Sequence, residues 1–538
     1  MLFRSYEFKD IHCTRIAEGI AYPDLHTFGS DETQEGESYT KDENSGQPKS
    51  LAVTQSLHST LPFHKNTHNA PKYSPEYRLY NAMDCVVLPE ILPKQLAKIE
   101  RDGNTHAYES QRALLRASVF NSAFGIRMPP DALPTLRTHL DNQFIVTRQR
   151  VRNHIGNQEY NPNSVQQKRA LFYGDKHSTK STDEKHLLKL QQSTNAFISK
   201  AATLHLAFGK LKTARNTYSK MRLLNGRFVY ALDPIGTRFG RPSSRQFLIY
   251  GGNAQNQNEV TKSLMLPEEG YVLYKADGAQ AEARVIANEA NEPQMLEIFA
   301  KGLDFHSEIF SIMYNMPASE ARTYYPPVGM GRHSGRYICK RVGHGKNYGL
   351  TGYGIAVQLG IPSAHGKKLD KLHTAKFPRM GEWRKELETQ YYRKGRRFIT
   401  CLGRTYTFYH SPWRRVMNNV LAYMGQSPVG DLTNGVYTWV LDDVECAIIS
   451  LLEHDGFYFQ LPESIGWSAH AEILTQVRAR MERTLTCVNG NEFSIPCDLT
   501  MCTKNFNTKD KTQAIELESI APTYLDSTYE RAQVHIPS

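Results

Sequence analysis

Three segments of this 538-residue chain carry the side chains best suited to chemistry. In the first, YVLYKADGAQAEAR, the apolar run predicts a short buried strand that ends at Lys275, and Asp277 is the first acid after it. Gln280 and Glu282 follow, and a helical pattern begins at Ala281. Carboxylate oxygens are the ligands that Mg²⁺ prefers, so an acid at a strand end is a candidate metal ligand. The composition of the segment alone also fits an ordinary junction between a strand and a helix.

The second segment, RYICKRVGHGKNYG, repeats cationic or aromatic residues every four positions. Arg336, Lys340 and His344 share one stripe of a predicted helix, because each step of four residues drifts by only ~40° around the axis. Tyr348 follows four residues later. Two cations and an imidazole on one stripe suit a polyphosphate, although a solvated basic face is the alternative. The glycines at 343 and 345 each weaken a helix interior by ~1 kcal/mol, which indicates a close approach of another group.

The third segment, AIISLLEHDGFYFQLP, contains two apolar runs separated by Glu453, His454, Asp455 and Gly456. Asp-Gly between two apolar runs is a strong signal for a tight turn. The pattern therefore predicts a β-hairpin with Asp455 at its exposed tip.

These three segments, in this order, resemble motifs A, B and C of DNA polymerase family A, the DNA polymerase I class. In motif B only the aromatic position departs, because His344 stands where the family carries Phe or Tyr. A fourth match lies just upstream of motif A, where one group of residues resembles the family's template and primer signature: Thr237, Gly240-Arg241, Ser243-Ser244, Asn253, Gln255 and Asn256. The tail CDLTMCTKNF resembles the closing strand of the phage members, with Phe506 in place of tryptophan.

The resemblance implies a site for nucleotidyl transfer from dNTPs to a primer 3′ end. Asp277 and Asp455 would hold two Mg²⁺ ions. Arg336 and Lys340 would bind the β and γ phosphates, and Lys340 is also the implied proton donor to pyrophosphate. Tyr348 would stack near the templating base. The resemblance further implies nucleotide contacts for His306, His344, Gln280 and Glu282, and DNA contacts for Thr237, Arg241, Asn253, Gln255, Asn256, Gln426 and His454.

Besides Phe506, three positions depart from the family pattern. Gly456 stands where the family supplies a third acid, and Ala422 stands where it carries an asparagine before Gln426. In the family, Tyr at the position of His344 tolerates a dideoxynucleotide, whereas Phe selects against it. Histidine is flat like Phe but has a nitrogen donor, so we expect it to behave like Tyr.

The expected fold is a mixed α and β right-hand polymerase preceded by a partial RNase H-like exonuclease domain. The predicted domains are a partial 3′–5′ exonuclease-like domain at 1–103 with a polar loop at 29–76, a thumb at 104–228, a palm with motif A at 229–290, fingers with motif B at 291–397, and a palm with motif C at 398–538. Amphipathic helices are expected over 10–25 and 77–92.

Tyr80 and Asp84 match the Tyr-x₃-Asp motif of the proofreading exonuclease. The carboxylates that normally complete that metal site come from earlier motifs, which this sequence lacks. We therefore predict that exonuclease activity is absent or incomplete, and that a separate exonuclease polypeptide or a processivity factor is a further partner.

Composition agrees with primer-template DNA and dNTPs as partners. The formal net charge of +11 favours a polyanion. The basic runs over 210–227 and 390–415 contain no acid, which suits contact with duplex phosphates or a solvated face. Eight cysteines without metal-ligand spacing predict reduced thiols in a cytoplasm, that of the host if a phage encodes the chain. No apolar run approaches the ~18 residues of a membrane span, so no membrane partner is expected.

Two other classes remain as alternatives. A single-subunit RNA polymerase shares the two aspartates and the basic helix, but Glu282, five residues after Asp277, matches the steric gate that excludes a ribose 2′-hydroxyl. An inactive nucleic-acid-binding relic is suggested by the missing exonuclease motifs and by Gly456. Because both candidate metal ligands are present, the sequence favours the enzyme.

Overall fold

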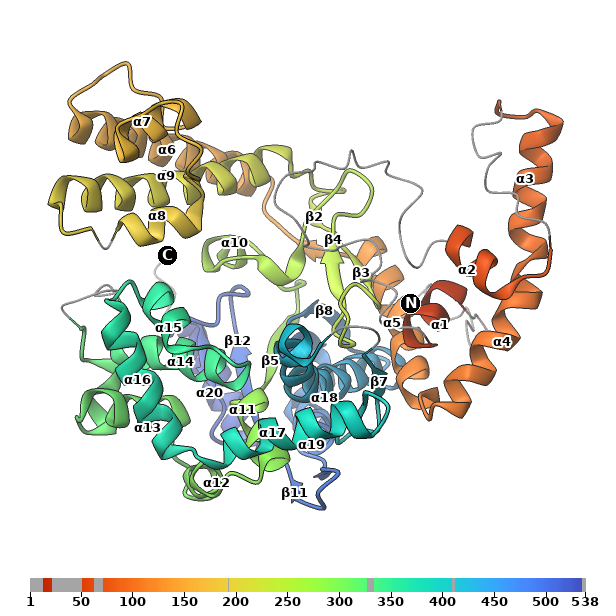
Figure 1. The fold of residues 1–538 in the computed structure, drawn as a ribbon. Coiled ribbons are helices and arrows are strands. Elements are labelled where there is room, and N and C mark those ends of the chain that lie inside the picture. The colour runs from red at the N-terminus through yellow and green to blue at the C-terminus, as the bar shows by residue number, and fades with distance from the viewer. Residues whose placement is uncertain are drawn as a thin grey trace. The chain divides into compact units, whose positions relative to one another are not determined.

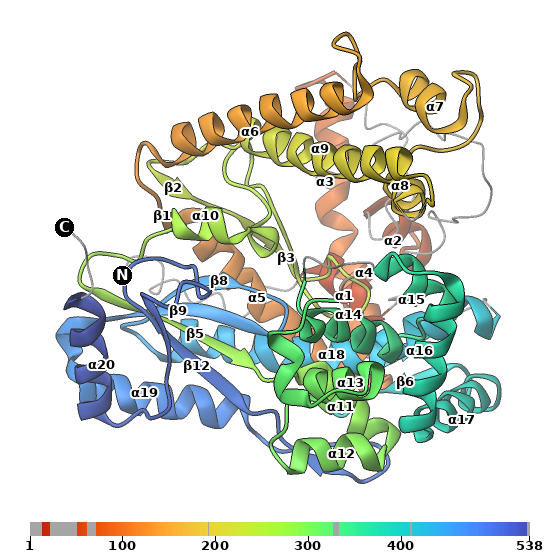
Figure 2. The same ribbon diagram turned by 90° about the vertical axis from the view of Figure 1, so that its left-hand side faces the viewer.

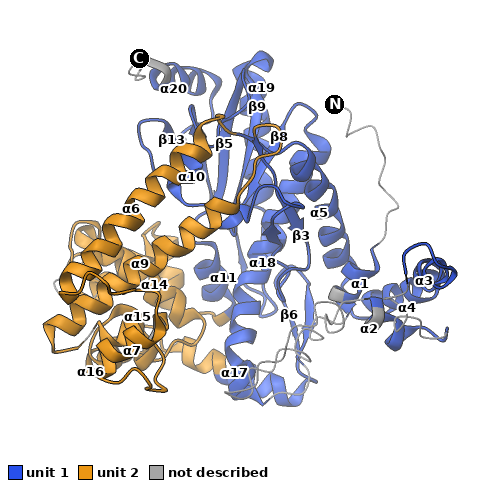
Figure 3. Cartoon of the chain, turned by 90° about the horizontal axis from the view of Figure 1, so that it is seen from above, with its two compact units in different colours: residues 1–127, 227–289, 385–538 blue, residues 128–226, 290–384 orange. Residues whose placement is uncertain are grey.

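The computed structural model describes residues 13–21, 51–61, 71–191, 193–326, 333–408 and 412–534. The chain forms two compact units (Figure 3): unit 1 consists of residues 1–127, 227–289 and 385–538, and unit 2 of residues 128–226 and 290–384. Both units are therefore assembled from segments that lie far apart in the sequence. None of the helices in the described ranges combines the length and the apolar character needed to cross a bilayer.

A five-stranded antiparallel sheet forms the centre of unit 1, with the strand order β13-β12-β5-β9-β8. Its strands are β5 (Tyr271–Gly278), β8 (Ile448–Leu452), β9 (Gly456–Pro462), β12 (Cys497–Cys502) and β13 (Ala514–Glu516). Figure 2 shows β12, β5, β9 and β8 side by side. The central strand β5 lies between β12 and β9. This register places Asp277 opposite both Gly456 and Asp498.

Strand β5 is longer than the sequence predicted. The predicted end at Lys275 is wrong, because pairing continues to Gly278 and makes Asp277 a strand residue. Val272, Leu273 and Tyr274 are at most 1% exposed, as expected for a strand covered on both faces. The strand can continue through charged residues because Lys275 and Asp277 form an ion pair with each other.

Helices α18 (Trp413–Asp443) and α19 (Gly466–Met481) pack on this sheet. The Tyr274 hydroxyl lies 2.8 Å from Nδ1 of His470, which fixes β5 against α19. Unit 1 also contains α5 (Thr105–Ala123), α10 (Glu259–Ser263), α11 (Ala281–Ala290) and α20 (Pro522–Val534). Its two-stranded sheets are β1 (Ile126–Arg127) with β2 (Arg227–Phe228), β3 (Ala231–Asp233) with β4 (Ser243–Arg245), β6 (Arg397–Ile399) with β7 (Thr405–Thr407), and β10 (Leu485–Thr486) with β11 (Glu492–Phe493).

The first hundred residues contain more helix than predicted. Helix α1 spans Thr14–Ala21, and helix α2 (Leu51–His58) lies inside the interval predicted as a polar loop, of which 29–50 and 62–70 fall outside the described residues. Helix α2 is stabilised by the burial of Thr54 and Gln55 and by a contact with α1, in which Nε2 of His58 lies 2.9 Å from Oε2 of Glu18. A pattern of polar residues could not show these contacts.

The single helix predicted over 77–92 is two helices. Helix α3 (Pro75–Val86) and helix α4 (Leu88–Arg101) meet at Val87. Pro89 occupies the first turn of α4, where its fixed φ and missing N–H are tolerated, and Pro93 lies inside the same helix.

Unit 2 is helical in its described residues. In the 128–226 segment, α6 (Ala132–Ile155) and α9 (Ala196–Lys220) lie side by side with α7 (Val165–Tyr173) and α8 (Glu184–Leu190) (Figure 1). The 290–384 segment contains α12 (Pro293–Ala300), α13 (Phe305–Tyr314), α14 (Gly335–Asn347), α15 (Gly352–Leu359) and α16 (Ser363–Lys376), and α17 (Arg379–Arg393) passes from unit 2 into unit 1. The predicted motif B helix is confirmed as α14.

The close approach predicted at the motif B glycines is also confirmed. A Cβ added to Gly343 would lie 2.7 Å from Cδ1 of Ile309, and the same addition at Gly345 would lie 3.1 Å from Cβ of Leu350. At Gly343, helices α13 and α14 therefore lie closer together than they could with a larger residue in place, whereas Gly345 leaves room for Leu350, just after α14.

Glu289, near the end of α11, makes the stability of unit 1 depend on pH. It is 7% exposed, and its Oε1 has no hydrogen-bond partner in the described structure. Burial raises the pKa of Glu289 from 4.5 to about 7, even though a hydrogen bond with Cys487 lowers it. The unfolded chain therefore loses this proton first, and the free energy of unfolding falls as the pH rises from about 4.5 to 7.

We expect Glu289→Gln to be more stable than the wild type at pH 8, by up to about 3 kcal/mol, with the gain disappearing near pH 4.5. Urea unfolding of both proteins at pH 5 and pH 8 measures the difference. An identical pH dependence in the two proteins would contradict the buried acid.

Candidate active site

The pairing of β5 with β9 brings Asp277 and Asp455 together. Asp277 lies opposite Gly456, and the amide of Gly278 donates a hydrogen bond of 2.9 Å to the carbonyl of Asp455. The pKa of Asp277 is raised to about 6, chiefly by burial. Lys275 opposes this rise, and the charge of Asp455 adds to it. Two interacting carboxylates in a partly buried position form a donor set that a divalent cation would stabilise.

The hairpin predicted for motif C is confirmed. The amide of Glu453 donates 2.8 Å to the carbonyl of Gly456, which closes a two-residue turn made of His454 and Asp455. Asp455 lies at the tip of the hairpin, and His454 beside it is exposed.

Gly456 provides the space that the Asp277 side chain occupies. A Cβ at Gly456 would lie 2.6 Å from the carbonyl oxygen of Ala276 and would press against Oδ1 of Asp277. The third acid of the family pattern is therefore incompatible with this arrangement of β5 and β9. The sequence showed the departure, and the close contact gives its physical reason.

Two lysines without a role in the sequence motifs lie beside Asp277 and Glu453. Nζ of Lys275 is 3.0 Å from Oδ1 of Asp277 and 3.4 Å from Oε2 of Glu453. Lys262 forms an ion pair with the other oxygen of Glu453. Burial alone lowers the pKa of Lys275, but Asp277 and Glu453 outweigh it and raise the pKa. The available signal was the spacing of Lys275 and Asp277, because residues two apart lie on one face of a strand.

The predicted steric gate, Glu282, lies in the first turn of α11 and forms an ion pair with Arg241. Both side chains are 13% exposed. The hydroxyl of Thr237 donates 2.6 Å to the carbonyl of Arg241. Three residues predicted from two separate motifs are thus brought together within unit 1. Gln280, just before α11, has a left-handed φ of 54° at the turn out of β5.

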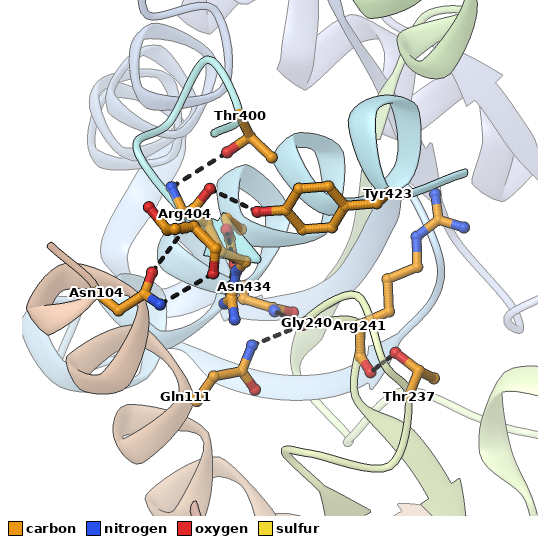
Figure 4. A network of polar contacts seen from close by, with 11 residues as sticks. Asn104, Gln111, Thr237, Gly240, Arg241, Thr400, Arg404, Tyr423 and Asn434 are labelled. Atoms are coloured by element: carbon orange, nitrogen blue, oxygen red, sulfur yellow. Dashed lines mark hydrogen bonds and ion pairs between the residues drawn. The ribbon is translucent and has the colours of Figure 1, made fainter. Parts of the chain in front are cut away.

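A buried polar network fixes the backbone before Arg241 (Figure 4). The carboxamides of Gln111 and Asn434 both donate to the carbonyl of Gly240, at 2.6 and 3.2 Å. The guanidinium of Arg404 packs against Gly240, where an added Cβ would lie 2.7 Å from Cζ. Two hydrogen bonds of 2.8 and 2.5 Å join Arg404 to Asp431. The network stabilises the turn that carries Arg241.

The Asn253-Gln255-Asn256 group lies at the short 3₁₀ helix η3 (Ala254–Asn256), next to β4. The Ser244 hydroxyl donates 2.7 Å to Oδ1 of Asn253, and the Ser244 amide donates 3.0 Å to Oε1 of Gln255. Asn253 and Gln255 therefore support the β3–β4 hairpin through the polar groups of Ser244. Gln426 is half-buried in α18.

Helix α14 in unit 2 carries the predicted phosphate-binding residues. Arg336 donates two hydrogen bonds to Asp304, at 3.0 and 2.5 Å, while Lys340 is exposed. These contacts lower the pKa of Asp304 to about 2 although burial opposes the shift. Tyr348 follows the last residue of α14 as its C-cap.

His306 on α13 lies next to His344, with ring centroids 5.4 Å apart. Its Nδ1 is buried without a hydrogen-bond partner in the described structure. Burial, followed by the charge of His344, lowers the pKa of His306 to about 3, so the ring is neutral near pH 7. The basic helix and the carboxylate pair belong to different units.

Tyr80 and Asp84 lie on α3, a helix in which no residue is buried. Within the described ranges, no group of three or more His, Cys, Asp or Glu side chains is arranged to hold a metal ion. The exonuclease role of Tyr80 and Asp84 therefore stays a prediction, and the Asp277–Asp455 site is a pair of acids.

Comparison with known proteins identifies the class and then the family. The POL domain of Pol1 from M. smegmatis, solved in complex with DNA primer-template and dNTP, matches with a TM-score of 0.63 and 20% identity, over 92% of this chain and 81% of that one. The chain thus has the mixed α and β fold of a polymerase domain, as predicted. The model of DNA polymerase family A matches residues 130–419, more than half of the chain. The chain belongs to DNA polymerase family A.

Sequence relatives are DNA polymerase I proteins of bacteria. The protein of Helicobacter pylori strain J99 is 22% identical over 325 residues, which are 58% of this chain and 33% of that protein. The protein of Geobacillus stearothermophilus is 23% identical over 351 residues, 61% of this chain and 37% of that protein. The chain spans about a third of the length of these curated relatives. Polymerases of family A depend in general on divalent metal ions.

Proposed function

We propose that this chain is a template-directed DNA polymerase that transfers nucleotides from dNTPs to the 3′ end of a DNA primer. The observation that carries the proposal is the Asp277–Asp455 pair, which two distant segments form within a family A fold. The pair fits Mg²⁺ because its oxygens are hard ligands and its two negative charges interact. Two ions bound there would lower the pKa of the primer 3′-hydroxyl and neutralise charge on the pyrophosphate.

The residues of α13 and α14 bind the triphosphate in this proposal. Arg336 releases the carboxylate of Asp304 and binds a phosphate, because a guanidinium forms paired hydrogen bonds with either anion. The exposed Lys340 binds the β and γ phosphates and donates a proton to the leaving pyrophosphate. The neutral His306 offers a ring N–H to the triphosphate, and Tyr348 stacks near the templating base.

DNA contacts are proposed for Thr237, Arg241, Asn253, Gln255, Asn256, Gln426 and His454. The network around Gly240 supports this role for Arg241, because a held backbone loses less conformational entropy when DNA binds. In the proposed thumb at 104–228, the exposed Lys210 and Lys212 of α9 contact phosphates irrespective of sequence. The palm at 229–290 and 398–538 and the fingers at 291–397 complete the proposed domains.

Primer extension with Mg²⁺, comparing dNTPs with NTPs on one primer-template, tests the proposal. Extension with dNTPs alone is the expected result. Extension with NTPs would indicate the RNA polymerase alternative, which family membership does not favour. Binding without extension would indicate an inactive nucleic-acid-binding relic.

Glu282→Ala should admit ribonucleotides. The Glu282 side chain is held in one place by Arg241 and, as steric gate, would fill the space that a 2′-hydroxyl needs. We expect the ratio of NTP to dNTP incorporation to rise by roughly one to two orders of magnitude, the range typical of a shape-based pocket. Glu297→Ala, at an exposed residue of α12, is the control. If Glu282→Ala left the ratio unchanged, the gate would have to be assigned elsewhere.

The purified chain should not shorten a 3′-labelled primer. Tyr80 and Asp84 lie on a helix without buried residues, and a single carboxylate beside a phenol cannot hold two metal ions by itself. Gel analysis over hours with Mg²⁺ checks this expectation, and degradation that Asp84→Ala removes would contradict it. We propose that a separate exonuclease polypeptide or a processivity factor joins this chain on DNA. A reducing cytoplasm, that of a host for a phage protein, suits its eight cysteine thiols.

A further inference from the structure

One face of the β5–β9 pair carries an unusual cluster of charges. Lys275 and Asp277 are two residues apart on β5, so both lie on the same face as their partners Tyr458 and Gly456 on β9. Glu453 lies across the two-residue turn from Gly456, on this same face. The absence of a side chain at Gly456 therefore leaves Asp277 and Glu453 without a residue between them.

Lys275 occupies the position between the two acids. Its Nζ is within ion-pair distance of both, at 3.0 Å from Asp277 and 3.4 Å from Glu453. The side chains of Lys275 and Glu453 are each 15% exposed. An ammonium in such a position would be costly without an acid beside it.

A second ammonium completes the cluster. Lys262 forms an ion pair with Glu453, and both lysines lie over the ring of Tyr458, at 5.4 and 5.6 Å from its centroid. Glu453 thus contacts two lysines, while Asp277 contacts Lys275. Lys275 is the member that links the candidate metal ligand to the rest of the cluster.

We propose that Lys275 is a positioning residue that acts as an internal counter-cation for Asp277 and moves onto Glu453 when a divalent ion binds. The inference rests on the proposed metal binding by Asp277 and Asp455. Without the ion, the ammonium offsets the repulsion between the two aspartates and holds Asp277 in place. Glu453 then receives the displaced ammonium, so that the ammonium is not left buried without an acid beside it.

The exchange needs little movement. The ammonium already lies within 3.4 Å of both acids, and a lysine side chain has several rotatable bonds that carry it from one acceptor to the other. Lys275 and the metal ion compete for the same carboxylate. Lys275 must therefore lower the affinity of the site for the ion, and Glu453 must raise it by accepting Lys275.

Mn²⁺ binding to the full chain, measured by electron paramagnetic resonance without DNA or nucleotide, tests the exchange. We expect Lys275→Met to bind Mn²⁺ about tenfold more tightly than the wild type, and Glu453→Gln about tenfold more weakly. In the double variant the Glu453→Gln effect should disappear, since no ammonium remains to be received. Lys275→Arg, which keeps the charge, should bind close to the wild type.

Lys262→Met is the matched control, because it removes a lysine from Glu453 that is not in the ion pair with Asp277. Its effect on Mn²⁺ affinity should be clearly smaller than that of Lys275→Met. Equal effects of the two variants would show that net charge alone sets the affinity, and would overturn the exchange. So would an unchanged affinity in Lys275→Met, or a Glu453→Gln effect that persists in the double variant.

Asp277→Asn separates this inference from the proposed function. If Asp277→Asn binds Mn²⁺ like the wild type, the proposed metal site itself is wrong. If Asp277→Asn loses the ion but Lys275→Met binds it like the wild type, only the role of Lys275 is wrong. Circular dichroism establishes that each variant is folded. If Lys275→Met does not fold, Lys275→Arg is used in its place.

Discussion

Asparagine at position 277 or 455 should abolish primer extension while leaving the affinity for primer-template nearly intact. Each change removes a charged oxygen from the pair that β5 and β9 bring together. A metal contact made in the transition state supplies several kcal/mol, so extension should slow on the order of 10³-fold. Affinity should persist because it comes mainly from many phosphate contacts.

Single-turnover extension and a binding titration on the same primer-template measure the two quantities. Asp498→Asn is the matched control, because Asp498 lies opposite Asp277 on β12 and has no assigned role. It should extend primers within a few-fold of the wild-type rate. Near-normal extension by Asp277→Asn or Asp455→Asn would falsify the assignment of the metal ligands.

His344→Phe should make the enzyme reject dideoxynucleotides that the wild type accepts. His344 lies on the stripe of α14 that carries Arg336 and Lys340, with its ring 5.4 Å from that of His306. An imidazole N–H beside the sugar can donate the hydrogen bond that a missing 3′-hydroxyl would have made, and Phe cannot. Losing one such bond to a charged group is worth about tenfold or more.

Ratios of dideoxy to deoxy incorporation for the wild type, His344→Phe and His344→Tyr provide the measurement. The tyrosine variant retains a polar donor and should accept dideoxynucleotides as the wild type does. Equal ratios for the wild type and His344→Phe would mean that His344 only packs within the helix.

Local signals were sufficient for much of the fold. The Asp-Gly turn before Phe457 predicted the motif C hairpin, and the four-residue repeat from Arg336 to His344 predicted α14, because both features depend on residues close in sequence. The family and its mixed fold followed from the order of four motifs. The role assigned to each of those residues remains a prediction.

The remainder depends on partners that are distant in sequence. Strand β5 was predicted to end at Lys275 because a charge usually ends an apolar run, yet Glu453, far along the chain, stabilises that charge. Arg336 was expected to await a phosphate, but the structure pairs it with Asp304. Gln111, Gly240 and Asn434 lie on three separate segments that meet at the Gly240 carbonyl, and no local pattern marks such a convergence.

The order of strands in the central sheet has a consequence for synthesis on the ribosome. Strand β5 is translated about 180 residues before β9, and β12 follows later still. At ~5–20 residues per second, the nascent chain must wait roughly 9 to 36 seconds before β5 can pair. During that interval its apolar residues Val272, Leu273 and Tyr274 have none of their native neighbours from β9 and β12, which leaves an apolar strand with unpaired backbone groups open to aggregation.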